Sequence, residues 1–152
     1  MAAGITIERG KLGALRAYLE EESADTVARL RENQSLSIDG AVAASGATVS
    51  LYESLQKAGP FGSAHPQPVL ALPHHILADV RLVGRDHVRV ALRGADGKRV
   101  NAVAYRVAEG DGGRFLFKSI GQSVHIVGKL SLNQWNGSVI PQIQILDAAV
   151  PI

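Results

Sequence analysis

Arginine and lysine side chains are concentrated in one short stretch of this 152-residue chain. Between positions 81 and 106, seven basic residues face two acidic ones, Asp86 and Asp96. The basic residues are Arg81, Arg85, Arg89, Arg93, Lys98, Arg99 and Arg106. Up to Pro60 the acidic residues outnumber the basic ones by eight to six, so the positive charge belongs to the second half. Such a local field favours an anionic partner, nucleic acid first, and the alternative is a solvated face that serves solubility.

No pattern in the sequence is typical of catalysis or metal binding. The chain has no cysteine, which excludes disulfides and thiolate metal sites. Its five histidines are scattered, and the adjacent His74 and His75 are expected to diverge on a strand. Two-metal phosphoryl chemistry requires converging carboxylates, and the spacing of the acidic residues supplies none. We therefore expect no cofactor, no metal and no catalytic activity in this chain alone.

Alternation of apolar and polar residues predicts a β-hairpin in the basic stretch. In residues 87–93 and 99–105 every second residue is apolar and is expected to face a core. These residues are Val88, Val90, Leu92, Val100, Ala102 and Ala104. Asp96 and Gly97 supply the turn between the two strands. The outward residues that we take as candidates for binding nucleic acid are Arg89, Arg93, Arg99, Asn101 and Tyr105.

The rest of the second half completes the pattern of a β-barrel. Strands are predicted over residues 69–83, 123–133 and 138–148, with a short helical turn around 115–120. The order strand, strand, strand, helix, strand, strand is that of the five-stranded oligonucleotide/oligosaccharide-binding (OB) barrel. Ligands of that fold lie across the second and third strands, which is where the basic hairpin falls.

Two further residues join the candidate site. Lys129 faces outward on the fourth barrel strand, and Trp135 lies in the predicted loop between the last two strands. A positive groove with an aromatic platform suits single-stranded nucleic acid, although Trp135 could equally pack against the end of the barrel. On the last strand, the inward side is expected to comprise Val139, Ile143 and Ile145, opposite Gln142 and Gln144.

The first half is poorer in core-forming residues. Residues 3–8 alternate as a short strand would, and a helix is predicted from Lys11 onward. A second strand is predicted over residues 36–44, followed by a helix with Ser45 or Thr48 as its cap. Two strands and two helices over about sixty residues bury little apolar surface, so this half is interpreted as a remnant of a larger domain.

Three segments resemble the C-terminal part of the RecJ family, bacterial single-stranded-DNA-specific exonucleases of the DHH phosphoesterase superfamily. They are "MAAGITIERGKLGALRAYLEE", "IDGAVAASGATVSLYESLQKAGPFGSAHPQPVLAL" and "VGKLSLNQWNGSVIPQIQILDAA". The most specific piece is the joint from Pro60 to Pro68, which in the family reads Pro-Phe-Gly-x-Gly-Asn-Pro-x-Pro. Here Ala64 and His65 replace Gly and Asn, the residue types that most easily adopt a positive φ.

The resemblance implies three parts in the chain. Residues 1–34 resemble the closing strand and helix of the DHH-associated domain, residues 35–67 a connecting strand, helix and joint, and residues 68–149 a complete OB-type barrel. The expected fold is therefore mainly β with helices. It is a five-stranded OB-type β-barrel preceded by a strand–helix remnant of the DHH-associated domain and a connecting helix.

The resemblance also implies a function. Family members hydrolyse DNA from the 5′ end with a divalent metal pair, Mn or Mg, held in a DHH domain upstream of the region matched here. The chain is thus expected to bind single-stranded DNA for an exonuclease of DNA recombination and repair. Its expected partners are that DNA and the upstream DHH and DHH-associated domains, in the cytoplasm and without a membrane. The alternative is a structural or protein-docking OB domain that braces the nuclease core without touching DNA.

Overall fold

The first unit of the chain contains one long helix. A computed structural model describes residues 4–32, 35–135 and 137–151. For residues 31, 32 and 135 it describes the backbone and not the side chain. Helix α1 (Leu12–Glu32) follows a single 3₁₀ turn, η1 (Arg9–Lys11), as the sequence pattern predicts. The predicted strand over residues 3–8 is wrong, because residues 4–8 form no strand. A strand needs a partner for its backbone hydrogen bonds, and the described residues of this unit, which ends at Leu36, contain none.

The second unit, residues 37–152, begins with a connecting segment that packs on the barrel. The strand predicted over residues 36–44 is reduced to β1 (Gly40–Ala41), which pairs in parallel with the start of the next strand. A 3₁₀ turn, η2 (Ala44–Gly46), leads into helix α2 (Val49–Gln56). The Thr48 hydroxyl accepts a hydrogen bond from the Leu51 N–H (3.1 Å), which confirms Thr48 as the helix cap.

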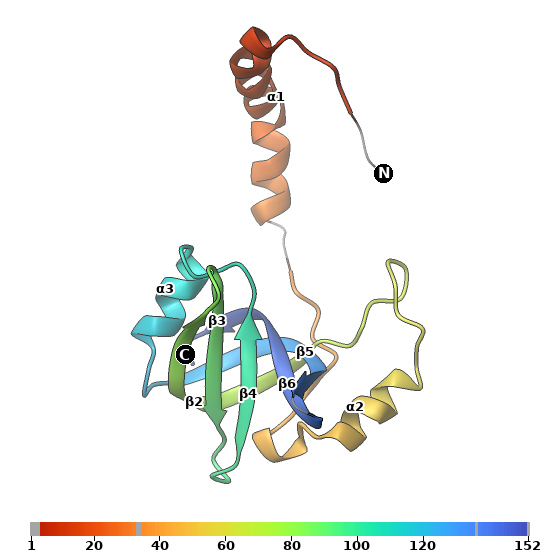
Figure 1. Cartoon of the computed structure of the whole chain (residues 1–152), viewed down its shortest axis with the longest axis vertical. Coiled ribbons are helices and arrows are strands. Elements are labelled where there is room, and N and C mark those ends of the chain that lie inside the picture. The colour runs from red at the N-terminus through yellow and green to blue at the C-terminus, as the bar shows by residue number, and fades with distance from the viewer. Residues whose placement is uncertain (1–3, 33–34, 136, 152) are drawn as a thin grey trace. The chain divides into compact units, whose positions relative to one another are not determined.

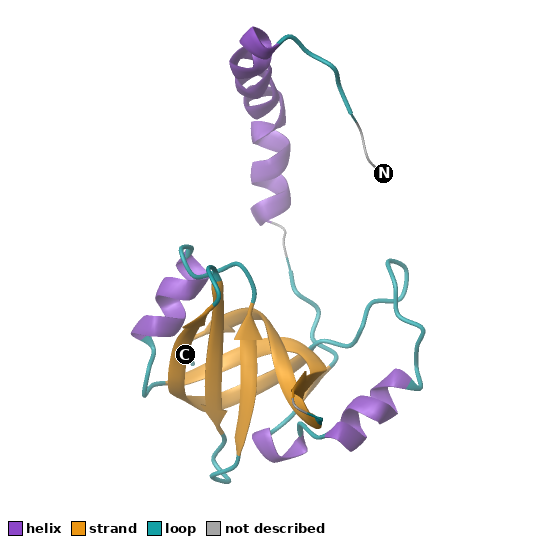
Figure 2. Cartoon of the chain, in the orientation of Figure 1, coloured by secondary structure: helices purple, strands orange, loops and turns teal. Residues whose placement is uncertain are grey.

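Five long strands form the closed barrel of the second unit (Figures 1 and 2). They are β2 (Leu70–Val83), β3 (His87–Arg93), β4 (Arg99–Ala104), β5 (Ser123–Trp135) and β6 (Ser138–Ala149). The sheet order is β1-β2-β3-β4-β6-β5, and an additional β2–β5 pairing closes it. Neighbouring barrel strands are antiparallel except β4 and β6, which are parallel. Helix α3 (Asp111–Lys118) lies between β4 and β5 in the sequence, so the predicted OB arrangement is confirmed.

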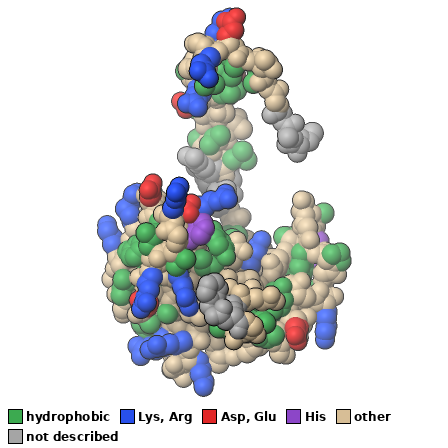
Figure 3. Space-filling view, viewed as in Figure 1, with side chains coloured by type: hydrophobic (Ala, Val, Ile, Leu, Met, Phe, Trp, Pro, Cys, Tyr) green, Lys and Arg blue, Asp and Glu red, His purple; other side chains and the backbone are tan. Residues whose placement is uncertain are grey.

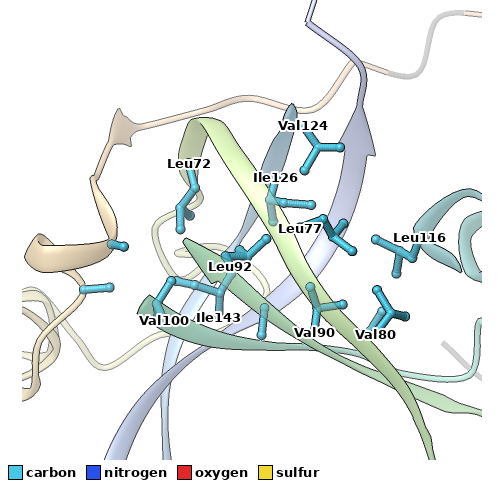
Figure 4. Packing of buried hydrophobic residues seen from close by; sticks show 14 of the residues in the cluster. Leu72, Leu77, Val80, Val90, Leu92, Val100, Leu116, Val124, Ile126 and Ile143 are labelled. Atoms are coloured by element: carbon cyan, nitrogen blue, oxygen red, sulfur yellow. The ribbon is translucent and has the colours of Figure 1, made fainter. Parts of the chain in front are cut away.

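The inward side chains of all five strands fill the barrel (Figure 4). Leu77, Val88, Leu92, Ile126 and Ile143 have no exposed surface. Each contributes about 1.5–3 kcal/mol through its burial, so the barrel is held chiefly by its apolar interior. The alternation predicted for β3 and β4 is therefore confirmed residue by residue.

Two register shifts let β2 pair with different strands along its length. One lies between Leu72 and His75 opposite β5, and the other between Leu77 and Asp79 opposite β3. His74 adopts a positive φ of 52° at the first shift and is exposed, whereas His75 is buried. The His75 Nε2 atom accepts from the Ala44 N–H (3.0 Å), so Nδ1 carries the proton and donates to the Pro73 carbonyl (2.9 Å). This histidine thereby joins η2 to the barrel.

Two details of the predicted elements need correction. Helix α3 begins at Asp111 rather than near Phe115, and it includes Gly113. A Cβ atom on Gly113 would lie 2.3 Å from the Val107 carbonyl oxygen, so the glycine permits a close approach rather than marking a loop. On β6, Val139 is 43% exposed instead of inward, because residues 138–140 pair with β5 only and extend beyond the β4–β6 contact.

The joint forms a turn between Gly62 and His65. Neither Ala64 nor His65 adopts a positive φ. The backbones of Gly62 and His65 exchange two hydrogen bonds (2.8 and 3.2 Å). The His65 ring also donates through Nε2 to the Ala58 carbonyl (2.8 Å) and packs against Phe61 at a centroid distance of 5.3 Å. His65 thus stabilises the turn through its own side chain.

Candidate nucleic-acid interface

The β3–β4 hairpin carries the predicted basic surface on the outside of the barrel. Its turn uses Gly97 at a φ of +76° and a hydrogen bond from the Lys98 N–H to the Asp96 carboxylate (3.0 Å). A hydrogen bond from the Ser45 side chain, together with that of Lys98, lowers the pKa of Asp96. The Asp96 carboxylate is therefore ionised at neutral pH and is engaged in hydrogen bonds of the turn.

Arginines stand directly opposite one another at two places on this surface. Arg81 of β2 pairs in register with Arg89 of β3, and Arg93 of β3 pairs with Arg99 of β4. Directly opposed like charges destabilise a sheet by a few tenths of a kcal/mol to about 1 kcal/mol. The fold alone does not favour this pairing, whereas an anion bound between the guanidinium groups would.

Three of these arginines have no carboxylate partner among the described side chains. Arg81 forms an ion pair with Asp79 (2.7 Å), and Arg114 forms one with Asp111. Arg89, Arg93 and Arg99 are exposed and form no ion pair with a described side chain. Their charge is available to a ligand.

The two arginines of β3 lie on either side of a small residue. On β3, Ala91 lies between Arg89 and Arg93. At the usual rise of a strand, its Cα atom is about 6.6 Å from that of each arginine, so roughly 13 Å separates the two arginine Cα atoms. Asn101 lies opposite Ala91, and Arg99 lies opposite Arg93. Figure 3 shows Lys and Arg side chains gathered over this part of the barrel. We call the outward side chains of β3 and β4, Arg89, Ala91, Arg93, Arg99, Asn101 and Val103, the basic face.

Tyr105 lies at the end of the basic face, just after β4. Tyr105 is 46% exposed, and its ring meets the His87 ring edge to face at a centroid distance of 5.1 Å. The backbone N–H of Arg106, a residue with a φ of +58°, donates to His87 Nδ1 (3.1 Å). His87 thus supports one side of the tyrosine and leaves the rest of its ring accessible to a base.

A row of carboxamide side chains continues the surface beyond β4, and the sequence prediction did not include all of it. Asn101 pairs with Gln142 of β6, and Val103 pairs with Gln144. On the far side of β6, Gln142 pairs with Ser131 and Gln144 with Lys129. The alternation of β6 already placed both glutamines outward, but only the parallel β4–β6 pairing brings them beside Asn101 and Val103 of the basic face.

The remaining predicted residues lie farther away. Lys129 is half-buried on β5. It belongs to the same cross-strand row as Arg89, but three strand spacings, about 14 Å around the barrel, separate the two residues. Trp135 is the last residue of β5 rather than part of a loop, and its backbone pairs with Ser138. The Trp135 side chain lies outside the described residues. The structure therefore groups the arginines, Asn101 and Tyr105, and separates Lys129 from them.

The described residues do not fit a metal centre. Within residues 4–32, 35–135 and 137–151, no group of three or more His, Asp or Glu side chains is placed to hold a metal ion. The ring centroids of His74 and His125 are 4.5 Å apart, but the His125 Nδ1 atom accepts a hydrogen bond from the His74 backbone N–H (3.2 Å) and is therefore engaged.

None of the described helices is long and apolar enough to cross a membrane.

Replacement of Tyr105 by alanine should weaken binding of a single-stranded oligonucleotide by about 1–3 kcal/mol, since that is the contribution of one base stacked on an aromatic ring. The salt dependence of binding should change little, because the substitution removes no charge. Fluorescence anisotropy at several salt concentrations measures both quantities. Tyr105→Phe is the matched control and should retain the affinity, so an equal loss in both variants would contradict a stacking role.

Comparisons with known proteins identify the family. The family model described as RecJ OB domain matches residues 38–147. The chain is 29% identical to the single-stranded-DNA-specific exonuclease RecJ of Bacillus subtilis. The alignment covers 99% of this chain and 19% of that protein. A crystal structure of RecJ from Thermus thermophilus in complex with Mn²⁺ superposes with a TM-score of 0.57 at 21% identity, over 98% of this chain and 20% of that one. The chain thus spans about a fifth of these relatives. With residues 38–147 matched, the chain belongs to the RecJ OB domain family.

Proposed function

We propose that this chain binds single-stranded DNA through the basic face. The observation that carries the proposal is the pair of opposed arginines, Arg93 and Arg99, which have no carboxylate partner among the placed side chains. Phosphate groups supply the missing negative charge, and bidentate contacts suit the planar guanidinium groups. Single-stranded DNA is the favoured anion because the related exonuclease from Bacillus subtilis is named as specific for it.

In this proposal the chain is one part of a RecJ-like exonuclease. It holds the substrate strand for a metal-dependent catalytic core that lies outside the residues described, and it acts in DNA recombination and repair in the cytoplasm. The parts proposed for it are a remnant of the DHH-associated domain (1–34), a connecting segment (35–67) and the OB barrel (68–149). The barrel supports this role because the basic face lies on its second and third strands, β3 and β4, where OB barrels bind oligonucleotides.

The salt dependence of oligonucleotide binding tests the proposal. If Arg89, Arg93 and Arg99 each contact one phosphate, log Kd should change with log salt with a slope of magnitude about 2, that is about 0.7 per contact. Anisotropy titrations of the full chain with a labelled single strand at four or more salt concentrations give the slope. The duplex of the same sequence should bind more weakly.

Two results would contradict the proposal. Absence of binding at low salt would favour a structural or protein-docking barrel that braces the nuclease core. Equal affinity for the duplex and the single strand would indicate general attraction between charges.

A further inference from the structure

We infer that the carboxamide row, Asn101, Gln142 and Gln144, contacts the edges of the nucleobases while the arginines hold the phosphates. The inference rests on the proposed function and assigns the base-contacting part of the same surface. It begins from the cross-strand register, which places the three carboxamides next to one another. Asn101 of β4 is the direct partner of Gln142, and Gln144 follows two residues later on the same outward side of β6.

The three carboxamides have unused hydrogen-bonding capacity. Each carries two N–H donors and a carbonyl acceptor, and all three side chains are half-buried. None of them makes a side-chain hydrogen bond within the described part of the chain. The nearby Ser131 hydroxyl donates to the main-chain carbonyl of Gln142 (3.2 Å). This hydrogen bond does not involve the side-chain carboxamide of Gln142. These half-buried amides are left to solvent, so they are accessible to a polar ligand that can replace it.

The spacing of the strands separates the charged and uncharged groups by a suitable distance. β3 carries Arg89 and Arg93, and β6 lies two strands away, about 9.5 Å at the usual strand separation. This separation is comparable with the reach of a nucleotide from its phosphate to the far edge of its base. Val103 lies between Arg89 and Gln144 in one cross-strand row and provides an apolar contact beneath the base.

The described part of this surface is poor in aromatic residues. Between the arginines of β3 and the glutamines of β6, the outward residues that the structure places include no aromatic ring, and Tyr105 stands at one end. Bases over the row therefore find hydrogen-bonding groups rather than stacking partners. Because a carboxamide can both donate and accept, each of the four bases can be accommodated, and little sequence preference follows.

An abasic oligonucleotide separates base contacts from phosphate contacts. The probes are a labelled oligonucleotide of mixed sequence and one of equal length in which the central nucleotides lack bases. We expect the full chain to bind the complete strand more tightly than the abasic strand. The Q142A/Q144A variant should lose about fivefold or more in affinity for the complete strand, as expected for two lost neutral hydrogen bonds, with little loss for the abasic strand. Its salt slope should stay unchanged, since no charge is removed.

Two further variants make the experiment decisive. Asn101→Ala, on the neighbouring strand, should act in the same direction and gives a second measurement if the double variant folds poorly by circular dichroism. Gln122→Ala is the matched control, because this glutamine lies between α3 and β5, outside the row, and should leave both affinities unchanged.

The outcomes distinguish this inference from the proposed function. If the unmodified chain binds neither strand, both fail together. If it binds both strands equally, or if the folded Q142A/Q144A variant loses affinity for both in proportion, the carboxamides do not contact bases, and DNA binding by the arginines stands. Unchanged affinity of that variant for the complete strand would also overturn the inference.

Discussion

Simultaneous replacement of Arg89 and Arg93 by alanine should lower the affinity for single-stranded DNA at least about tenfold. Hydrogen bonds to charged groups contribute about 1.5–3 kcal/mol each, and the solvent exposure of these arginines reduces that contribution. The loss should be similar for all sequences, since phosphate contacts carry no base information. The slope of log Kd against log salt should fall by about 1.4, that is by 0.7 for each lost contact. Anisotropy titrations at several salt concentrations measure both effects.

The same variant should not lose stability. Arg93 directly opposes Arg99, so its removal relieves a repulsion of up to about 1 kcal/mol. The midpoint of thermal unfolding should therefore stay constant or rise slightly. R114A/K118A is the matched control, because it removes two positive charges from α3, outside the basic face. An equal loss of affinity in R114A/K118A, or full affinity in a folded R89A/R93A variant, would rule out a specific role for the basic face.

Replacement of Gly128 by alanine should destabilise the barrel by about 3 kcal/mol or more, a large part of the total stability of a domain of this size. The added Cβ would lie 2.2 Å from the Gln144 carbonyl oxygen and 2.7 Å from the Ile143 Cγ2 atom. Backbone cannot yield as a flexible side-chain end can, so β6 must shift away from β5. Urea unfolding followed by circular dichroism measures the change.

Gly62→Ala provides the comparison for this substitution. A Cβ atom added to Gly62 would have no neighbour within 4 Å, and Gly62 has no positive φ, so its replacement should change stability by less than about 0.5 kcal/mol. If Gly128→Ala and Gly62→Ala unfold at the same urea concentration, the close β5–β6 contact does not limit stability. Because Gln144 belongs to the displaced segment, Gly128→Ala should also weaken DNA binding, and the apparent affinity should scale with the fraction of the chain that stays folded.

Local patterns predicted the parts of the fold that depend on neighbouring residues. The period of two placed Val88, Val90 and Leu92 inside the barrel, and the Asp96-Gly97 pair predicted the hairpin turn. Thr48 was one of two predicted caps, and its hydroxyl makes the expected contact. These features need no information about distant strands, so the sequence alone is sufficient for them.

Features that depend on distant pairing were not predictable in the same way. The opposition of Arg81 and Arg89 follows from the register shift at Leu77 in β2, which no local pattern marks. Gln142 and Gln144 join the basic face through a parallel pairing between β4 and β6, which are separated in the chain by α3 and β5. Residues 3–8 have the alternation of a strand, but alternation cannot show that a hydrogen-bonding partner is present.

We expect the seam between β4 and β6 to couple barrel opening to ligand binding. In the described residues, the seam consists of three residue pairs, from Asn101–Gln142 to Val103–Gln144, whereas β5 and β6 are paired over eleven. Separation of β4 from β6 breaks few backbone hydrogen bonds and is therefore a low-energy route of sub-global opening. A strand with its phosphates on β3 and its bases on β6 crosses this seam and binds only the closed barrel. At a concentration about one hundred times Kd, such a ligand would raise the free energy of opening by about 2.7 kcal/mol, and bound DNA should therefore slow hydrogen exchange along the seam.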